Sequence, residues 1–544
     1  MPSFFTVRHS GGASRSPSFR CAEPPSPTRT GHLPLTRFLP AAVMLLTACG
    51  GGGGPRSITY YFTADPRSLD PAFSTDVPSG EVIATLFDNL TQFDADGRLV
   101  PGIATRWEAD TSGAVYTFHL RRDAVFHDGR PISASTVAAS FRRVLSLASK
   151  GSRTWTLTPI RGAAAFAAGE AGDIAGLAVP DDSTIVITLE EPLNVFPKLL
   201  AMPASAIVPE SVGPDFSERP VGSGPWRLVE WSHDDVLLLA ANEGYWGGRP
   251  ASDTLRIRII PEPLTQAAEF EFGQLAVVEV PFSETARWEA EHGTELQRRP
   301  ALRALYVAIN TRRGPLQDVR VRRALNMSVD AGTMMRTIMA GRGVRAAGAI
   351  PPGLEGYDST RAPYPYDPAA ARALLAEAGY ADGLTLKLWR TQRAELARIA
   401  QAIQQSLAQA GVTVEIIERD ASSARAASSK GEADLFLTDW YADYPDPESF
   451  NYPTFYSKNA GGGGNRAFYS DSVTDRMIML ARGTPDQALK DSLSRAIDQR
   501  IFEAAPWIFL WFPVDLWAQR ADVTGWEVPA IFNGQRWQTV RRIP

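Results

Sequence analysis

Residues 434–469 read DLFLTDWYADYPDPESFNYPTFYSKNAGGGGNRAFY, a stretch that starts as a strand and then leaves regular structure. The apolar run 435–437 is typical of a buried strand, and the later Tyr-Pro-Asp-Pro sequence can neither complete a strand ladder nor continue a helix. Such a strand delivers Trp440 and Asp443 to its carboxyl end, where ligands gather in open α/β domains. The stretch therefore predicts a ligand site, with a surface turn over a local core as the alternative.

The segments before this stretch alternate between helix and strand. Asp367 followed by Pro368 is typical of a helix start, and Gly379 of a helix end. Residues 394–410 predict a second helix, and residues 412–417 predict the strand that follows it. This alternation indicates an α/β architecture.

Length and composition limit the protein classes. With 544 residues the chain is too long for one core, so two or three domains are expected. The formal net charge of -5 has no basic stripe, which argues against a nucleic-acid partner. Thirteen tryptophans and 14 tyrosines supply stacking surface with a polar handle, as ligand-binding surfaces often require.

The first 48 residues differ in character from the rest. An arginine-rich segment precedes the apolar run 38–46, which is too short to span a bilayer but is typical of a signal-peptide core. The quartet Leu-Thr-Ala-Cys that ends at Cys49 resembles a bacterial lipobox, in which the cysteine is lipidated. The glycines that follow Cys49 favour a tether over a buried cysteine. We therefore expect a signal peptide at 1–48 and a lipidated Cys49 with a glycine-rich tether at 49–56.

These features predict export. Two or three acyl chains on Cys49 would anchor the protein stably to a membrane. The expected location is periplasmic or extracytoplasmic, as a membrane-anchored lipoprotein. After Cys49 the sequence contains no run long and apolar enough for a transmembrane helix.

Known catalytic and metal-binding motifs are missing from the sequence. It contains no H-E-x-x-H, C-x-x-C, G-x-S-x-G, Walker A or G-x-G-x-x-G motif, so no metal, cofactor or catalytic residue is predicted. Asp439, Asp443, Asp446 and Glu448 do crowd one loop, and a glycosidase needs two carboxylates about 5–10 Å apart. A single carboxylate in an aromatic pocket serves equally well as the counter-ion of a bound ammonium group.

Several segments, taken in order, carry a resemblance to a known family. They are SLDP at 68–71, LFDNL at 86–90, GRLVPGIATRWE at 97–108, VGSGPW at 221–226, NEGYW at 242–246 and VRVRRALNMSVD at 319–330. Together they resemble the extracytoplasmic solute-binding proteins of the oligopeptide/dipeptide-binding family, the receptors of ABC importers. The match runs from about residue 57 to residue 525.

The resemblance implies an α/β periplasmic-binding-protein fold with two lobes, a hinge and an additional small domain inserted in the first lobe. We expect the strands at 305–310 and 508–514 to cross between the lobes and to act as the hinge through which the lobes close on a ligand. The expected boundaries are 57–93, 209–310 and 512–544 for lobe I, 94–208 for the inserted domain and 311–511 for lobe II.

The resemblance also implies a function without covalent chemistry. A monomeric receptor of this kind captures a peptide or similar small amine-bearing solute between its lobes and delivers it to a membrane permease with its ATPase. Residues 440–443 match the family's W-x-A-D segment, in which the aspartate pairs with the peptide's amino group. By this match Asp443 would bind the amine, and Trp440 would pack on the ligand. The backbone of Tyr441 and Ala442 would extend the ligand as an added strand. A turn or N-cap acid is the alternative for Asp443.

The far end of the ligand has no motif to identify it. Arg390, directly after the predicted strand 384–389, is a candidate by position alone. Without a cation there, the ligand would be something other than a short peptide. Two other functions stay open: an exported, glycosidase-like hydrolase using carboxylates of the 439–448 loop, and a non-transport sensor with the same fold.

Overall fold

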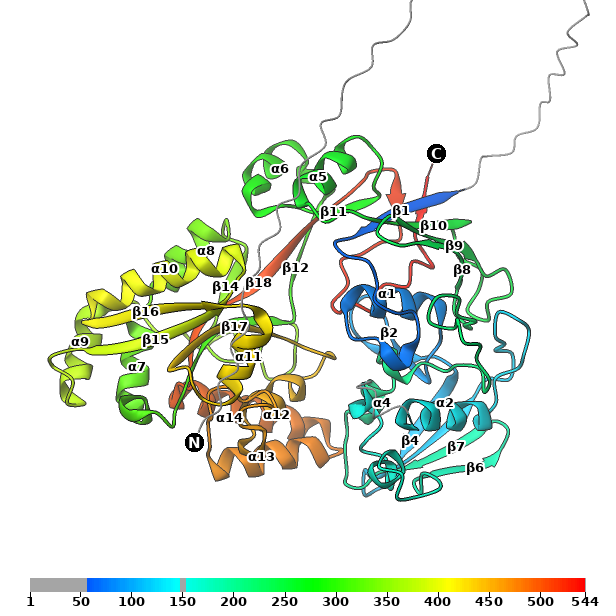
Figure 1. Cartoon of the computed structure of the whole chain (residues 1–544), viewed down its shortest axis with the longest axis horizontal. Helices are drawn as coiled ribbons and strands as arrows, with labels where there is room; N and C mark the ends of the chain where they lie inside the picture. Colours follow the sequence, from blue (N-terminus) through cyan, green and yellow to red (C-terminus); the bar gives the residue numbers. More distant parts are fainter. Residues whose placement is uncertain (1–55, 147–152, 544) are drawn as a thin grey trace, which may run out of the picture. The chain divides into compact units, whose positions relative to one another are not determined.

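The computed structural model describes residues 56–146 and 153–543 (Figure 1). The described residues form one compact unit. The predicted signal peptide and Cys49 lie outside the described residues, as does all but the last residue of the tether. In the part that the structure describes, no helix is both long and apolar enough to cross a membrane.

A four-stranded sheet contains the first described strand. Its strands are β1 (Ser57–Phe62), β8 (Trp226–Ser232), β9 (Val236–Ala241) and β10 (Thr254–Ile259). The order is β1-β10-β9-β8, and β1 lies parallel to β10 while the other neighbours are antiparallel. Helix α1 (Val77–Leu86) begins where the Asp76 carboxylate accepts a hydrogen bond from the Ser79 amide at 2.9 Å. Its buried side chains share a core with this sheet.

A second sheet is fully antiparallel. Its strands are β4 (Ala104–Ala109), β5 (Val115–Leu120), β6 (Leu177–Asp181) and β7 (Thr184–Thr188), in the order β4-β5-β7-β6. Alternate residues of β5 are buried, because successive side chains of a strand point to opposite faces. Helix α2 (Ala134–Ser146) shares the core that these residues form. This sheet lies within the predicted inserted domain.

The largest sheet has eight strands. They are β11 (Val277–Glu279), β12 (Leu296–Pro300), β13 (Arg303–Ile309), β14 (Gly343–Arg345), β15 (Leu384–Thr391), β16 (Val412–Arg419), β17 (Leu435–Tyr441) and β18 (Trp507–Gln519). The main order is β11-β18-β13-β17-β15-β16, with β12 and β14 also paired to β18. Strand β15 is parallel to β16 and β17, whereas β13 is antiparallel to β17 and β18.

Helices cover both faces of this sheet (Figure 1). Leu305, Val307 and Ile309 of β13 join one core, and Ala304, Tyr306 and Ala308 join the other, as the two-residue period of a strand requires. The first core includes residues of α7 (Val319–Met327), α8 (Ala331–Ile338), α9 (Pro368–Glu377) and α10 (Ala394–Gln409). The second includes residues of α11 (Ala421–Ser429), α12 (Glu448–Phe455), α13 (Ser472–Gly483) and α14 (Gln487–Ala504).

The predicted local elements of this region are confirmed. Helix α9 begins with Pro368, and the Asp367 carboxylate accepts a hydrogen bond from the Ala370 amide at 2.9 Å. Helix α10 and strand β16 occupy the predicted positions within two residues at each end. The layered α/β architecture therefore follows from local signals that agree with the tertiary packing.

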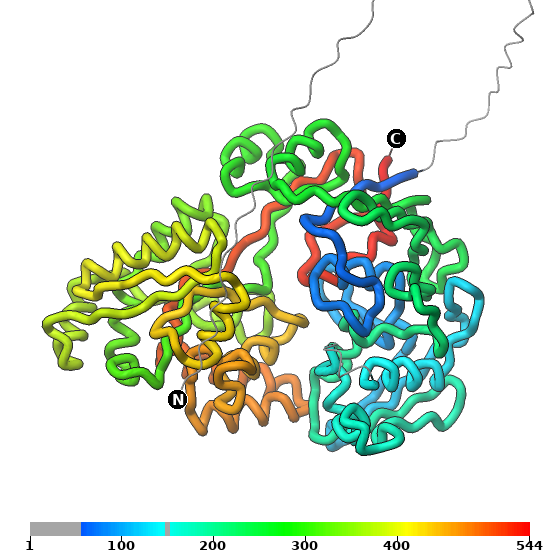
Figure 2. The backbone as a smooth tube through the Cα atoms, in the orientation of Figure 1, coloured from blue at the N-terminus to red at the C-terminus, as the bar shows by residue number. Residues whose placement is uncertain are grey.

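Strand β18 is long enough to pair with four other strands of the large sheet. Its first half pairs with β13 and β14, and its second half pairs with β11 and β12. Figure 2 shows this strand as part of a continuous orange-to-red tube. The strands predicted as hinges, 305–310 and 508–514, fall on β13 and β18, which pair with each other. Their hinge role and the lobe boundaries stay predictions.

Shorter elements complete the described chain. They are β2 (Thr91–Phe93), β3 (Leu99–Pro101), α3 (Ala163–Ala167), α4 (Phe196–Leu199), α5 (Pro263–Glu271), α6 (Thr285–Glu291), β19 (Val523–Thr524) and β20 (Arg541–Arg542). Strands β2 and β3 pair with each other, as do β19 and β20.

Candidate functional site

A cavity of about 650 Å³ lies where distant segments of the chain meet. It is lined by residues 74–77 before and within α1, residues 153–156, the end of β17, part of β18 and residues 526–537 before β20. Pockets for small ligands typically have about 300–1,000 Å³. The sequence prediction assigns these segments to lobe I, the inserted domain and lobe II.

The end of β17 supplies three lining residues, Tyr441, Ala442 and Asp443. The Ala442 amide donates to the Leu302 carbonyl at 2.8 Å, and the Asp443 amide donates to the Ser449 hydroxyl at 2.9 Å. Both bonds hold the backbone of this turn in place. Because the Ala442 amide already has a partner, the predicted extension of a ligand as an added strand would have to use other backbone groups.

Asp443 presents a carboxylate without a fixed partner. Among the described residues, no hydrogen-bond donor or cation lies within bonding distance of its side-chain oxygens. Burial raises the pKa of this carboxyl, the charge of Arg153 opposes the rise, and the charge of Glu448 adds to it. A cationic ligand group would therefore find an acceptor that the protein leaves open.

Two predicted site residues are not among those that line the cavity. The Trp440 indole donates to the Ser449 carbonyl at 2.8 Å, so this side chain braces the turn into α12. Arg390 belongs to β15, which continues to Thr391 instead of ending at residue 389. The parallel register places Arg390 opposite Glu418 of β16, and the two side chains form an ion pair away from the cavity lining. The structure thus does not bring Arg390 to the site.

The other three acids of residues 439–448, at the end of β17 and in the loop after it, are held in ion pairs. Asp446 is fully buried, and its carboxylate lies 2.7 Å from the Lys198 ammonium group. The remaining pairs are Asp446 with Lys490, Asp439 with Arg303 and Arg393, and Glu448 with Arg482. Of the four acids of the loop, Asp443 is the one that lines the cavity. The loop therefore does not present the paired carboxylates that a glycosidase requires.

Arg153 brings a positive charge to the cavity, and no motif in the sequence predicted it. Its guanidinium donates to the Thr75 carbonyl at 3.1 Å. Since its charge lowers the pKa of Asp443, the two side chains interact. Among the described lining residues, Arg153 is the one with a permanent positive charge.

Besides Asp443 and Asp76, three carboxylates line the cavity, and they were not predicted from the sequence. They are Glu81 of α1, Glu279 of β11 and Asp515 of β18, here called the acidic group. Glu279 is the register partner of Trp517, which places it diagonally across from Asp515. No local pattern marks these residues, because β-strand pairing across more than 200 positions brings Glu279 and Asp515 together.

The pKa values of all three carboxyls in the acidic group are raised. Burial raises the pKa of Glu81 to about 8. Burial also raises the pKa of Glu279 to about 7, and the neighbouring Asp515 contributes to this rise while Arg342 and Arg303 oppose it. Burial raises the pKa of Asp515, against the same two arginines. Although 46% of the Glu279 side chain is exposed, the residue lines the cavity, so this exposure includes the surface that a ligand would cover.

Aromatic side chains form much of the remaining wall. Trp517 and Trp526 have ring centroids 5.5 Å apart, and Tyr60 and Trp537 have centroids 4.5 Å apart. Trp155, Tyr441 and Phe532 also line the cavity. Aromatic faces attract cations as well as apolar groups, so this wall suits a ligand that carries both.

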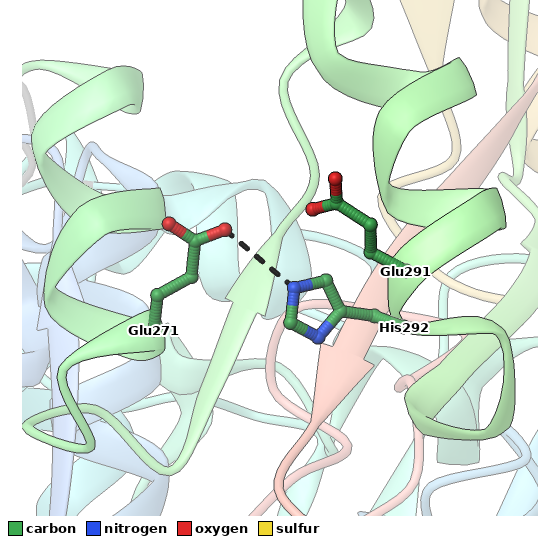
Figure 3. Close-up of side chains that lie close together, drawn as sticks. All are labelled: Glu271, Glu291 and His292. Atoms are coloured by element: carbon green, nitrogen blue, oxygen red, sulfur yellow. Dashed lines mark ion pairs between the residues drawn. The ribbon is translucent and has the colours of Figure 1, made fainter.

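A second cluster of ionisable groups lies on helices α5 and α6 (Figure 3). Glu271, Glu291 and His292 come close enough to suggest a metal site. However, the Arg287 guanidinium already lies 2.6 Å from Glu271 and 2.9 Å from Glu291. The His292 ring also lies 2.9 Å from Glu295. This cluster is best described as a surface ion-pair network, and we assign no metal to it.

Similarity to known proteins identifies the family. Residues 98–462 match the model described as bacterial extracellular solute-binding proteins, family 5 Middle. The chain belongs to this family. The glutathione-binding protein GsiB of Escherichia coli O1:K1 is 30% identical over 503 residues, which cover 90% of this chain and 95% of that protein. Its counterpart in Shigella dysenteriae serotype 1 is 30% identical over 477 residues, covering 85% and 90%.

Solved structures of solute-binding proteins show the same fold. The unliganded open form of the murein tripeptide binding protein MppA gives a TM-score of 0.79 at 23% identity, covering 90% of this chain and 98% of that one. DppA from Helicobacter pylori, in complex with the peptide STSA, gives 0.73 at 26% identity with the same coverage. The predicted periplasmic-binding-protein fold is therefore confirmed.

Membership of the solute-binding family also settles the broad role. The family comprises binding proteins of ABC transporters, and the relatives are periplasmic. The chain is thus a substrate-binding receptor of this class, and the hydrolase alternative is not favoured.

Proposed function

We propose that this solute-binding protein captures a peptide or similar small amine-bearing solute in the 650 Å³ cavity, with Asp443 binding the amino group. The receptor then delivers the solute to an ABC permease with its ATPase, acts as a monomer and performs no covalent chemistry. The observation that carries the proposal is the Asp443 carboxylate. It lines the cavity, and no described residue pairs with it.

The relatives support this class of ligand. Glutathione, a murein tripeptide and the peptide STSA appear in the names of similar proteins, and all three are peptides. A charge-assisted hydrogen bond between an ammonium group and a desolvated carboxylate contributes about 1.5–3 kcal/mol. That range corresponds to an affinity difference of roughly 10-fold to 150-fold.

The direct test compares peptides with free and acetylated amino termini. Asp443→Asn keeps the shape of the side chain and removes its charge, so we expect it to weaken binding of a free-amine peptide at least tenfold and to leave the acetylated peptide little changed. Isothermal titration calorimetry measures both, using a peptide identified by mass spectrometry of ligand that co-purifies with the protein. Equal losses for both peptides would refute the amine-binding role.

The proposal includes the location predicted from the sequence. A signal peptide at 1–48 would export the chain, and lipid on Cys49 would hold it at the extracytoplasmic face of a membrane. The Cys49→Ala variant should then lose lipid labelling and fractionate apart from the membrane or stay unprocessed. A variant that is still lipidated and membrane-anchored would contradict the anchor.

A further inference from the structure

The charges that line the cavity do not balance for a simple peptide. A peptide with neutral side chains brings one ammonium and one carboxylate, and Asp443 and Arg153 can accommodate that pair. Asp76 also lines the cavity, but its two oxygens accept hydrogen bonds from the amide and hydroxyl of Ser79 at the start of α1. The acidic group of Glu81, Glu279 and Asp515 is left facing the cavity.

Little within the described residues compensates the acidic group. Glu81 and Asp515 form no hydrogen bond or ion pair with a described residue, and both are part-buried residues that line the cavity. The Arg342 guanidinium lies 3.4 Å from Glu279, but it is buried and donates at 2.6 Å to the Val280 carbonyl. Arg303 pairs with Asp439. Enclosed carboxylates without partners are costly, unless a ligand supplies the missing positive charge.

The surroundings of the acidic group suit a cation in shape as well as in charge. Tyr60 and Trp517 line the cavity beside these carboxylates, since Tyr60 interacts with both Glu81 and Glu279 and Trp517 is the register partner of Glu279. An ammonium or guanidinium group on a flexible aliphatic stem could place its charge among the carboxylates and its stem against the rings.

We propose that the solute carries a second cationic group, an amine or guanidine separate from the one at Asp443, and that Glu81, Glu279 and Asp515 bind it. The ligand class is therefore a peptide with a basic side chain, or a free polyamine of the same chemistry. This inference rests on the proposed function as a receptor for amine-bearing solutes. It predicts a ligand other than glutathione, for which the relatives are named, because a solute with two carboxylates would add negative charge to an acidic wall.

The test uses pairs of alanine-based peptides, three to five residues long, in which one position is lysine or its uncharged analogue norleucine. We expect the best lysine peptide to bind wild-type protein at least tenfold more tightly than its norleucine partner, because the two differ only in the cation. Glu81→Gln combined with Asp515→Asn should remove most of this preference, so that the lysine-to-norleucine affinity ratio falls toward one. Equal affinities of the two peptides for wild-type protein would overturn the proposal, as would tighter binding of glutathione.

The arms of the experiment separate this inference from the proposed function. Loss of binding on amino-terminal acetylation, without a lysine preference, keeps the proposed function and rejects the second cation. Spermidine binding that exceeds all peptide binding and falls in the Glu81→Gln and Asp515→Asn double variant keeps the second cation and rejects the peptide. Because the lysine and norleucine comparison uses wild-type protein, it holds even where a variant folds poorly.

Discussion

The two charged regions of the cavity differ in how the protein balances them. Asp443 and Arg153 both line the cavity without forming an ion pair, so this region holds one negative and one positive charge. The acidic group gathers three carboxylates; of the two arginines beside it, Arg342 lies 3.4 Å from Glu279 but also donates to the Val280 carbonyl, and Arg303 pairs with Asp439. A balanced region can hold the termini that every peptide has, whereas an unbalanced region selects among side chains. We infer that Asp443 supplies general affinity and the acidic group supplies specificity.

A single substitution is expected to destabilise the loop that carries Asp443 more than the acidic group. Asp446, three residues further on, is fully buried between Lys198 of α4 and Lys490 of α14. Replacing Lys490 by methionine leaves part of a buried charge uncompensated, and breaking a buried ion pair typically costs about 3–5 kcal/mol. Because Lys198 remains, we expect the free energy of unfolding to fall by about 3 kcal/mol, measured by denaturant titration.

This variant also separates the two regions. The exposed Lys458 makes no ion pair with a described residue, so Lys458→Met is the matched control and should leave stability unchanged. In Lys490→Met the affinity for all free-amine peptides should fall, while the ratio between lysine and norleucine peptides should persist. A loss of that ratio with normal overall affinity would contradict the division of roles.

The second prediction uses pH to sharpen the difference. A protonated carboxyl cannot form an ion pair, and the pKa values of Glu81 and Glu279 are about 8 and about 7. Cation binding must therefore release protons, and the affinity should rise with pH up to about 8. Between pH 6 and pH 7 we expect the lysine-to-norleucine affinity ratio to rise about tenfold, which is the limiting slope for one proton released over one pH unit.

The control for this profile is Glu81→Gln, which should flatten the rise. The other titratable or charged groups around Glu81 and Glu279 are Tyr60, Tyr61, Asp515, Arg303 and Arg342. The tyrosines have pKa values raised above 10, so they stay neutral across this range, and the arginines stay charged. A ratio that falls between pH 6 and pH 8 would contradict the binding of a cation by these acids.

The third prediction concerns Arg153. If it binds the carboxylate of a peptide, Arg153→Gln should weaken binding of a peptide with a free carboxyl terminus about tenfold, the lower end of the effect of a charge-assisted hydrogen bond. The affinity for the same peptide with an amidated carboxyl terminus should fall less in this variant. Calorimetry on the two peptides measures the difference, and an equal loss would show that Arg153 acts through Asp443 alone.

The sequence predicted the parts of the site that are contiguous. Tyr441 ends a strand, and Ala442 and Asp443 follow it; the strand's apolar run and the prolines after it are visible in a single window, and all three residues line the cavity. The helices beside that strand were likewise predictable, because caps such as Asp367 act locally. Fold and family were also predictable from short segments spread in order along the chain, and both are confirmed.

The parts that depend on long-range pairing could not be predicted. Arg390 was predicted to follow a strand directly, but the strand is two residues longer and its parallel partner places Glu418 opposite. Trp440 matched a motif, yet its indole is bonded to the Ser449 carbonyl. Glu279 and Asp515 become neighbours only through the pairing of β11 with β18. A sequence shows which residues are charged, but the pairing of distant strands decides which of these charges have an oppositely charged neighbour.

The smallest expected effect tests whether the acidic group is uncompensated in the empty protein. A carboxyl whose pKa is raised in the folded state binds more protons when folded than when unfolded, so stability falls as pH rises from about 4.5 toward the folded value of about 8 for Glu81. Removing this charge should stabilise the ligand-free protein at pH 8.5 and have little effect at pH 5.

We expect Glu81→Gln to raise the melting temperature at pH 8.5 by roughly 1–3 °C, since 1 kcal/mol shifts it by about 2–4 °C in chains of 150–250 residues. The exposed Glu170, replaced by glutamine, removes the same charge without this effect. If Glu81→Gln instead destabilises the empty protein at pH 8.5, the Glu81 charge already has a partner there, and the case for a second ligand cation is weakened.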